Sequence, residues 1–376
     1  MPQHEHKILI SGGGTGGHIF PAIAIADAIK KKLPGVDILF VGAKGRMEME
    51  KVPLAGYPIQ GLWISGFQRR LTLRNLLFPL KLIFSLIKAG RIINKFKPDV
   101  VVGVGGYASG PIGQMAARKG IPLVLQEQNS FPGITNKLLA KKALKICVAY
   151  EGMERYFPKE KLYLAGNPVR QNVIEIAGKR EQACQYFELE KGKPIVLIVG
   201  GSQGARSINE SVSKNLELLV MNNLQLLWQT GKLYTEKAGK DILEKLSGNN
   251  KNRVRVKEFI NKMDLAYAAA DIVVSRAGAI AISELCTVGK PSVLIPLPSA
   301  AEDHQTKNAL ALVEQDAAIH LKDSEASEKL AEHVSDLAKN QARREQLSKN
   351  IKKMSIPDSA DKIADEVIAL ISNNGS

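Results

Sequence analysis

The feature that most constrains this sequence is a local pattern that occurs twice: an apolar run, a glycine-rich loop and an amphipathic helix. The first copy combines a strand expected at residues 7–10, glycines between positions 12 and 17, and a helix expected at 21–33. The second combines residues 194–199, 200–205 and 207–219. A buried strand that enters a helix through glycines is the opening unit of a doubly wound α/β domain. The sequence therefore predicts two domains of that type.

The remaining sequence alternates short apolar runs with helical stretches, as parallel sheets covered on both faces require. Further strands are expected at residues 38–41, 100–104, 123–125 and 143–148, and then at 225–228, 254–257, 271–274 and 291–295. We expect an α/β fold of two doubly wound, Rossmann-like domains facing across a cleft. Residues 1–166 would form the first domain and residues 167–357 the second. The C-terminal segment, 358–376, would contain a closing helix at 359–372 docked on the first domain.

The positive charge of the chain is concentrated in its first half. The 376 residues include 52 lysines and arginines against 37 acids, a net charge of +15. Residues 1–166 hold 24 of these basic and 10 of these acidic side chains, so the second half is nearly neutral. Such an excess indicates an anionic partner, either nucleic acid, a phospholipid surface or a phosphorylated substrate. Nucleic acid is disfavoured, because aromatic residues make up only 5% and no recognisable module combines them with basic side chains.

The cysteines and the apolar segments bear on the cellular compartment. Cys147, Cys184 and Cys286 lie far apart and form no CxxC pair, which argues against a disulfide framework or a zinc site. The N-terminus does not resemble a signal peptide, and the longest uncharged stretch, residues 100–117, contains five glycines and Pro111. We therefore expect a soluble or peripheral protein in a reducing compartment.

The two glycine loops are candidate phosphate sites. Gly12-x-Gly14-x-x-Gly17 matches the dinucleotide fingerprint, in which backbone N–H groups at a helix start hold phosphate. No acid follows the second expected strand to hold a ribose, so a pyrophosphate-binding loop is favoured over a nicotinamide site. The second loop adds the hydroxyl of Ser202. A tight turn without ligand is the alternative for both loops.

Two polar segments follow later strands. Glu284 lies inside an expected helix of small and apolar residues, where it is either a solvated side chain or an acceptor for both hydroxyls of a ribose. Residues 302–309 form a polar cluster that is either a helix cap or part of a site. No DxD pair occurs near a strand end, so we expect no metal.

Six segments together resemble one family, the MurG-type transferases that add N-acetylglucosamine to undecaprenyl-pyrophosphoryl-N-acetylmuramyl-pentapeptide in peptidoglycan synthesis. The segments are GGGTGGHIFPA (12–22), GVGGYASGP (103–111), QEQNSFPGITNKLLAK (126–141), GNPVR (166–170), GGSQGARSIN (200–209) and RAGAIAISE (276–284). The resemblance implies the two-domain GT-B glycosyltransferase architecture. It also implies UDP-N-acetylglucosamine as donor, conversion of lipid I to lipid II, and no cofactor.

The resemblance places the donor in the C-terminal domain, with residue roles carried over by motif. Ile260 would contact uracil, Arg170 and Ser202 the donor phosphates, and Gln305 a sugar hydroxyl. The nucleotide-binding turn would comprise Ala279, Ile280, Ala281, Ile282, Ser283 and Glu284, with Glu284 at the ribose. Further donor positions would be Thr15, Gly16, Gly17 and Asn129. Some members have Gln-Gln where this chain has His304-Gln305, so the sugar contact that the first glutamine makes in those members falls on a histidine here.

The expected chemistry is inverting transfer to the 4-hydroxyl of the acceptor, which needs a base and stabilisation of the departing diphosphate. His18 follows the first glycine loop at the start of a helix, whose dipole keeps an imidazole neutral. Glu127 is the other candidate base. His18 has two alternative roles, capping the helix or binding acceptor phosphate.

Residues 69–97 predict the membrane-facing surface. An apolar face is expected from Leu73, Leu76, Leu77, Leu80, Ile83, Phe84 and Ile87, with Arg70, Arg74, Lys81 and Lys88 along its edge. A second apolar face lies opposite, so one face is free to anchor on anionic lipid. Pro79 marks a possible helix start, and a wholly buried helix is the alternative. Because the resemblance implies an acceptor lipid held at an anionic membrane, it also implies a peripheral protein on the cytoplasmic face of the bacterial inner membrane.

Overall fold

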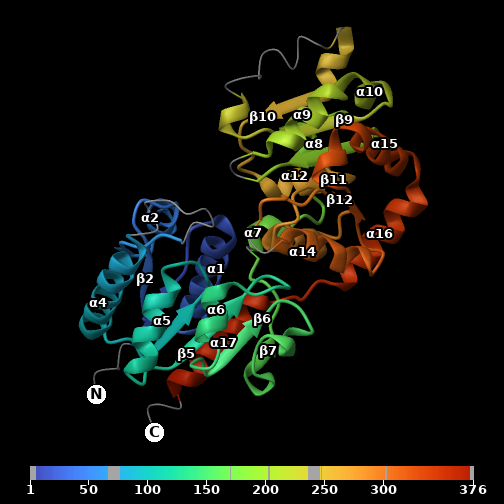
Figure 1. Cartoon of the computed structure of the whole chain (residues 1–376). Helices are drawn as coiled ribbons and strands as arrows, with labels where there is room; N and C mark the ends of the chain where they lie inside the picture. The colour runs from blue at the N-terminus through green and yellow to red at the C-terminus, as the bar shows by residue number, and fades with distance from the viewer. Residues whose placement is uncertain are drawn as a thin grey trace. The chain divides into compact units, whose positions relative to one another are not determined.

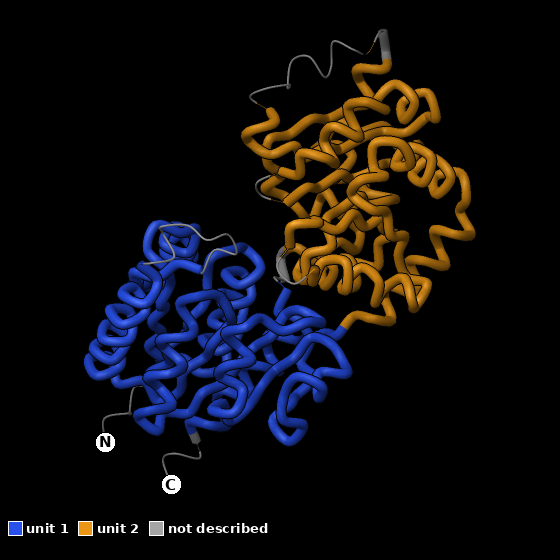
Figure 2. Tube along the Cα trace, in the orientation of Figure 1, with its two compact units in different colours: residues 1–170, 356–376 blue, residues 171–355 orange. Residues whose placement is uncertain are grey.

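The structure is a computed structural model that describes residues 6–66, 77–169, 171–201, 204–235, 246, 248–300 and 303–372. The chain divides into two compact units, which Figure 2 draws in blue and orange. Unit 1 comprises residues 1–170 and 356–376, and unit 2 comprises residues 171–355. Arg170 and Ser202, both predicted to contact donor phosphates, lie outside the described residues, as do Leu73 and Leu76.

In the described part of unit 1, seven parallel strands form a sheet in the order β3-β2-β1-β4-β5-β6-β7 (Figure 1). The strands are β1 Lys7–Ser11, β2 Asp37–Ala43, β3 Ile59–Leu62, β4 Val100–Gly103, β5 Leu123–Glu127, β6 Lys145–Val148 and β7 Leu162–Leu164. The helices are α1 Gly16–Lys32, α2 Glu48–Leu54, α4 Phe78–Phe96, α5 Ser109–Arg118, α6 Ile134–Leu139 and α17 Ser359–Ser372.

Alternate residues of the unit 1 strands pack into two apolar cores, one on each face of the sheet. Ile8 and Ile10 of β1 point to the face covered by α1 and α17, where Ile363 and Val367 join the same core. Leu9 points to the opposite face, which carries α4, α5 and α6. The C-terminal helix, red in Figure 1, therefore packs on α1 within unit 1.

In the described part of unit 2, six parallel strands form a sheet in the order β10-β9-β8-β11-β12-β13. The strands are β8 Ile195–Val199, β9 Gln225–Gln229, β10 Val254–Lys257, β11 Ile272–Ser275, β12 Ser292–Leu294 and β13 Ile319–His320. The helices are α7 Gln171–Ile174, α8 Arg180–Tyr186, α9 Arg206–Lys214, α10 Leu216–Met221, α12 Met263–Ala269, α13 Ala279–Val288, α14 His304–Val313, α15 Ala326–Lys339 and α16 Gln341–Lys353.

Both sheets place their glycine loop at the point where the strand order reverses. β1 pairs with β2 on one side and β4 on the other, and β8 pairs with β9 and β11 in the same way. At such a switch point the loops beyond the carboxyl ends of the strands diverge, which is where doubly wound sheets bind ligands. The fold therefore brings the loops after β1 and β4 together in unit 1, and those after β8 and β11 in unit 2.

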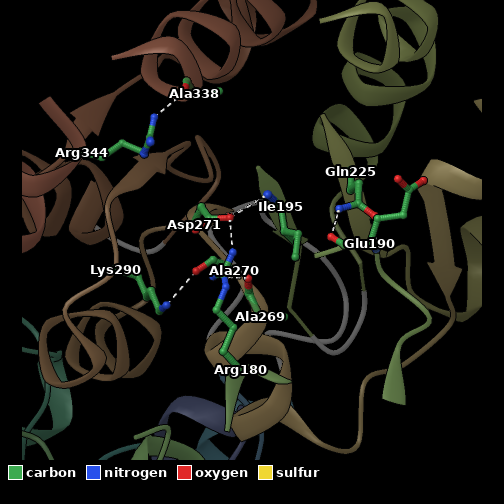
Figure 3. Close-up of polar contacts among 10 residues, drawn as sticks. All are labelled: Arg180, Glu190, Ile195, Gln225, Ala269, Ala270, Asp271, Lys290, Ala338 and Arg344. Atoms are coloured by element: carbon green, nitrogen blue, oxygen red, sulfur yellow. Dashed lines mark hydrogen bonds and ion pairs between the residues drawn. The ribbon is translucent and has the colours of Figure 1, made fainter. Parts of the chain in front are cut away.

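A polar network holds the amino-terminal edge of the unit 2 sheet, away from its glycine loop (Figure 3). Asp271 Oδ2 accepts hydrogen bonds from the backbone N–H of Ile195 and from Arg180 Nη2, both at 2.9 Å. Lys290 Nζ donates to the carbonyl oxygen of Ala270 at 2.7 Å. Burial lowers the pKa of Lys290 to about 8; Asp271 acts to raise it and Arg180 to lower it further.

Candidate functional site

The glycine loop of unit 1 has a conformation that only glycine adopts readily. Gly13 has a φ of +150° and Gly14 a φ of +89°. A Cβ atom on Gly106, in the loop after β4, would lie 2.3 Å from the carbonyl oxygen of Gly13. The two loops are thus in direct backbone contact. Thr15 precedes α1 as its N-cap residue, and α1 begins at Gly16, earlier than the expected start at residue 21.

His18 lies in the first turn of α1 with its ring turned back to the loop. Its Nδ1 is 3.1 Å from the carbonyl oxygen of Gly13 and 3.3 Å from Thr15 Oγ1. Because a carbonyl only accepts, the bond to Gly13 requires the proton on Nδ1, which makes Nε2 the basic nitrogen of the neutral ring. A Cβ atom on Gly105 would lie 2.9 Å from Nε2, so any other residue at position 105 would clash with the imidazole ring where it now lies.

Glu127, at the end of β5, has a buried carboxylate that accepts four hydrogen bonds. Oε1 accepts from the backbone N–H and the side-chain amide of Asn129, and Oε2 accepts from the backbone N–H of Gly133 and from Asn136. Burial raises the pKa of Glu127, and these donors act against that rise. Since four acceptances saturate a carboxylate, Glu127 is placed to anchor the loop after β5, and the arrangement favours His18 as the base.

Asn129 is one of the predicted donor-site residues, and its side chain is held by Glu127. Next to it, Gln126, Gln128 and Asn167 form a buried amide network: Gln126 donates to Asn167 at 3.1 Å, and Asn167 donates to the carbonyl of Gln128 at 3.0 Å. The segment directly before Arg170 is therefore tied to the carboxyl edge of the sheet.

The second glycine loop is equally tight. Gly201 and Gly204 have φ values of +85° and +77°, and a Cβ atom on Gly204 would lie 2.2 Å from the carbonyl oxygen of Thr230. Gln229, at the end of β9, donates to the carbonyl of Gly201 at 3.0 Å and accepts the backbone N–H of Ile260 at 2.9 Å. Gln229 thus joins the second glycine loop to Ile260, the predicted uracil contact.

The predicted nucleotide-binding turn forms the start of α13, which follows β11. Backbone N–H groups in the first turn of a helix have no partner within it, so this end can hold an anion. Ile282 lies in the core, and Ala279 is also buried. Glu284 is half-buried, and its Oε2 accepts a hydrogen bond from the Tyr267 hydroxyl at 2.9 Å.

Gln305, the predicted sugar contact, lies near the start of α14. Its Oε1 accepts the backbone N–H of Leu297 at 2.9 Å, so its amide –NH₂ is the end that can donate to a sugar hydroxyl. Among the described residues, no group of three or more His, Cys, Asp or Glu side chains is arranged to hold a metal ion.

The structure thus gathers the predicted residues into two groups, one per unit. Unit 1 brings together Thr15, Gly16, Gly17, His18 and the Glu127–Asn129 pair at the carboxyl edge of its sheet. Unit 2 brings together Ile260, the start of α13 and Gln305 at the carboxyl edge of its own.

Three residues that bond to these groups were missed from the sequence: Glu48, which accepts the backbone N–H of Gly14, Gln229, which accepts that of Ile260, and Tyr267, which donates to Glu284. Gln229 gave a weak signal as a polar residue at a strand end. Glu48 and Tyr267 gave none.

Family comparisons identify the chain. The model of the glycosyltransferase family 28 N-terminal domain matches residues 8–148, and that of the C-terminal domain matches residues 195–363. The chain belongs to glycosyltransferase family 28. The first match contains His18 and Glu127, and the second contains Ile260, Glu284 and Gln305.

Curated relatives of this family 28 chain agree over its whole length. Two proteins, from Flavobacterium psychrophilum and Cytophaga hutchinsonii, are each 52% identical over 100% of both chains. Both are named UDP-N-acetylglucosamine--N-acetylmuramyl-(pentapeptide) pyrophosphoryl-undecaprenol N-acetylglucosamine transferase. The crystal structure of Acinetobacter baumannii MurG gives a TM-score of 0.77 at 26% identity and covers 97% of this chain and 99% of that one. The expected family, glycosyltransferase class and two-domain α/β fold are confirmed.

Proposed function

We propose that this glycosyltransferase moves N-acetylglucosamine from UDP-N-acetylglucosamine to undecaprenyl-pyrophosphoryl-N-acetylmuramyl-pentapeptide, the step from lipid I to lipid II. The observation that carries the proposal is the 52% identity, over the full chain, with two relatives whose name states this transfer. The two glycine loops support it, because each offers backbone N–H groups at the carboxyl edge of a parallel sheet, where phosphates bind.

The donor nucleotide is assigned to unit 2. Glu284 accepts the ribose hydroxyls, and the start of α13 faces the diphosphate with its backbone N–H groups. Arg170 and Ser202 complete the phosphate contacts, Ile260 lies at the uracil, and Gln305 donates to a sugar hydroxyl. Thr15, Gly16, Gly17 and Asn129 in unit 1 are assigned to the donor as well.

The reaction is an inverting displacement. The 4-hydroxyl oxygen of the acceptor bonds to the anomeric carbon while the bond from that carbon to the UDP oxygen breaks, so a β-1,4 linkage forms. The hydroxyl proton passes to Nε2 of His18, the nitrogen that the bond to Gly13 leaves basic. Negative charge develops on the departing UDP, and the backbone N–H groups at the start of α13, together with Arg170 and Ser202, would stabilise it. Donors that are already oriented stabilise such charge most effectively, because they need not reorganise during the reaction.

The membrane surface is assigned to α4 of unit 1. Leu80, Ile83, Phe84 and Ile87 are exposed on this helix, and Phe84 is 56% exposed. The ring centroids of Trp63 and Phe84 are 6.1 Å apart. These two rings and Ile87 line a groove of about 600 Å³. Its other walls include four cations, Lys44, Lys88, Arg91 and Lys95. An apolar face edged by cations is the chemistry that binds an anionic lipid surface.

The opposite face of α4 is buried in the core through Ala89, Ile92 and Ile93, so the wholly buried helix considered as an alternative is not what the structure has. No helix within the described ranges combines the length and the apolar character needed to cross a bilayer. We propose peripheral attachment to the cytoplasmic face of the bacterial inner membrane, where the lipid-linked acceptor is held.

The test is direct transfer by the purified chain. Labelled UDP-N-acetylglucosamine is incubated with lipid I in detergent, and we expect label in the lipid fraction together with an equal amount of UDP. UDP-glucose in place of the donor tests specificity, and omission of lipid I tests for reaction of the donor alone. Release or isomerisation of the sugar without acceptor, or no label in the lipid, contradicts the proposal.

A further inference from the structure

Glu48, on α2, is a buried acid that the reaction described above does not use. Its side chain is 1% exposed. Oε1 accepts the backbone N–H of Ala43, and Oε2 accepts the backbone N–H of Gly14, both at 2.9 Å. The carboxylate thus occupies one of the amides of the glycine loop from inside the protein.

The amide that Glu48 binds belongs to the same peptide group as the carbonyl that holds His18. The Gly13–Gly14 peptide donates its N–H to Glu48 Oε2, and its C=O accepts from His18 Nδ1 at 3.1 Å. A single planar group therefore connects the carboxylate to the imidazole, with a hydrogen bond at each end.

Three glycines surround the Glu48 carboxylate and the Gly13–Gly14 peptide, and a side chain at any of them would overlap one of these groups. A Cβ atom on Gly13 would lie 2.2 Å from Glu48 Oε1, and one on Gly42 would lie 2.4 Å from Glu48 Cγ. A Cβ atom on Gly106 would lie 2.3 Å from the Gly13 carbonyl oxygen itself. Three separate positions thus lack a side chain where one would displace the carboxylate or the carbonyl.

We propose that Glu48 is a positioning residue that acts on His18 through the Gly13–Gly14 peptide. A carboxylate on the N–H of a peptide polarises it, so the carbonyl at the other end becomes a stronger acceptor. That carbonyl holds the neutral imidazole with its proton on Nδ1 and stabilises the ring after Nε2 has taken the acceptor proton. In serine proteases, a carboxylate hydrogen-bonded to the catalytic histidine fixes its tautomer and stabilises its charged form. Here Glu48 would have the same effect on His18 through the intervening peptide group. The inference rests on the proposed role of His18.

The first measurement needs no variant and no turnover. In protein labelled with ¹⁵N in histidine, the imidazole shifts of His18, identified by their loss in His18→Gln, give the tautomer of the neutral ring at pH about 8.5. We expect the proton on Nδ1. A proton on Nε2 overturns the proposal.

The second measurement uses Glu48→Gln, with Glu50→Gln on the same helix as the matched control. Glutamine keeps the shape of the side chain, but its –NH₂ cannot accept from an N–H, so one of the two backbone bonds is lost. Glu50 is exposed and pairs with Lys51, so its replacement should change nothing. For Glu48→Gln we expect a shift of His18 towards the Nε2–H tautomer and a fall in kcat of about 10- to 100-fold, with KM for UDP-N-acetylglucosamine unchanged.

The outcomes separate this inference from the proposed function. An unchanged His18 tautomer in folded Glu48→Gln overturns the relay even if turnover falls. If Glu48→Gln does not fold, the wild-type tautomer decides. If the wild-type chain transfers no sugar, the proposed function fails, whereas the tautomer measurement still tests the connection between Glu48 and His18.

Discussion

The Tyr267 hydroxyl donates a 2.9 Å hydrogen bond to Oε2 of Glu284 and so connects α12 to α13 in unit 2. Tyr267 is buried in the core, whereas Glu284 is half-buried at the carboxyl edge of the sheet. This bond fixes the direction of the Glu284 carboxylate, the group that we propose as the acceptor for the ribose hydroxyls. If Glu284 holds the ribose as we propose, this bond orients its carboxylate before the nucleotide binds.

Glu284→Ala should weaken UDP binding by about 1–3 kcal/mol, because the ribose hydroxyls lose their acceptor. Tyr267→Phe should have the same direction with a smaller effect, about 1 kcal/mol or less, because only the orientation of the carboxylate is lost. Isothermal titration calorimetry with UDP measures both, and Glu314→Ala, at an exposed acid of the same unit, is the control. Equal affinity of Glu284→Ala and the parent chain would remove Glu284 from the donor site.

His18→Ala should lower turnover roughly 10²–10⁴-fold, the range for loss of a general base. UDP affinity should change little, because His18 is proposed to act on the acceptor hydroxyl and not to contact the nucleotide, and added divalent metal should not restore activity. Steady-state kinetics and calorimetry on the same preparation separate the two effects. If UDP affinity collapses together with turnover, His18 binds the donor; if turnover survives, the base is another group.

Interior strands were predicted well from the sequence because they are buried on both faces. β1, β2, β8 and β9 are almost continuous apolar runs, and their positions agree with the expected ones within two residues. The strands that escaped prediction, β3, β7 and β13, lie at the ends of the sheet orders, where each pairs with a single strand in the part of the chain that the structure describes. Edge strands bury less and often carry mixed sequences, so an apolar run marks them less clearly, although β10, which also ends a sheet order, was predicted at its observed bounds.

Helix ends were predicted less well. Pro21 suggested a helix start, since proline favours the first turn, but α1 already begins at Gly16 and contains Pro21. The helix expected at 207–219 is two helices, α9 and α10, which meet at Asn215. The side chain of Asn215 donates to the carbonyls of Ser211 and Ser327, and this local bonding competes with a continuous helix.

The candidate site could be predicted where a motif places its chemistry locally, as with His18 beside the glycine loop. It could not be predicted where the partner is remote. Glu48 binds Gly14 across 34 positions of sequence, and nothing in the spacing of the two residues indicates the contact. The resemblance also gave Ile282 as part of the nucleotide-binding turn, and its side chain is in the core. Membership in a turn assigns the backbone of a residue more reliably than its side chain.

Glu127→Gln tests whether Glu127 anchors its loop or serves as the base. The glutamine –NH₂ would face two donors, so the loop after β5 should loosen and its amides should exchange faster. Hydrogen exchange followed by mass spectrometry over residues 127–139 measures this, with Glu154→Gln at an exposed acid as the control. A turnover loss of roughly 10²–10⁴-fold with unchanged exchange would instead make Glu127 the base.

Lys290→Met should change how the stability of unit 2 depends on pH. The folded-state pKa of Lys290 is lowered to about 8, below its ordinary value of 10.5, so between these values the unfolded chain binds more protons than the folded one. The free energy of unfolding of the wild type should therefore rise relative to Lys290→Met as the pH rises from about 8 towards 10.5.

Thermal unfolding of unit 2 can be followed by the fluorescence of Trp228, which is buried in that unit. A Trp63→Phe background removes the other tryptophan of the chain. Lys322→Met, at an exposed lysine, should show no such dependence. A wild-type curve parallel to that of Lys290→Met across this range would mean that Lys290 is not held in an environment that disfavours its charge.

Phe84→Glu combined with Ile87→Glu should release the protein from anionic vesicles. Both side chains are exposed, so the charges should be tolerated by the fold while they remove apolar insertion and repel anionic headgroups. Co-sedimentation with vesicles that contain phosphatidylglycerol measures binding, and vesicles of phosphatidylcholine alone should retain little protein. Binding of the parent chain should also weaken as salt is raised, because salt screens the attraction between the cations around the groove and the anionic headgroups.

Leu218→Glu with Met221→Glu, which places the same two charges on exposed apolar residues of α10 in unit 2, should sediment like the parent. Calorimetry with UDP should give the parent affinity for both double variants. Retention of Phe84→Glu/Ile87→Glu on the anionic vesicles, or equal release of the α10 variant, would show that this face of α4 is not the membrane surface.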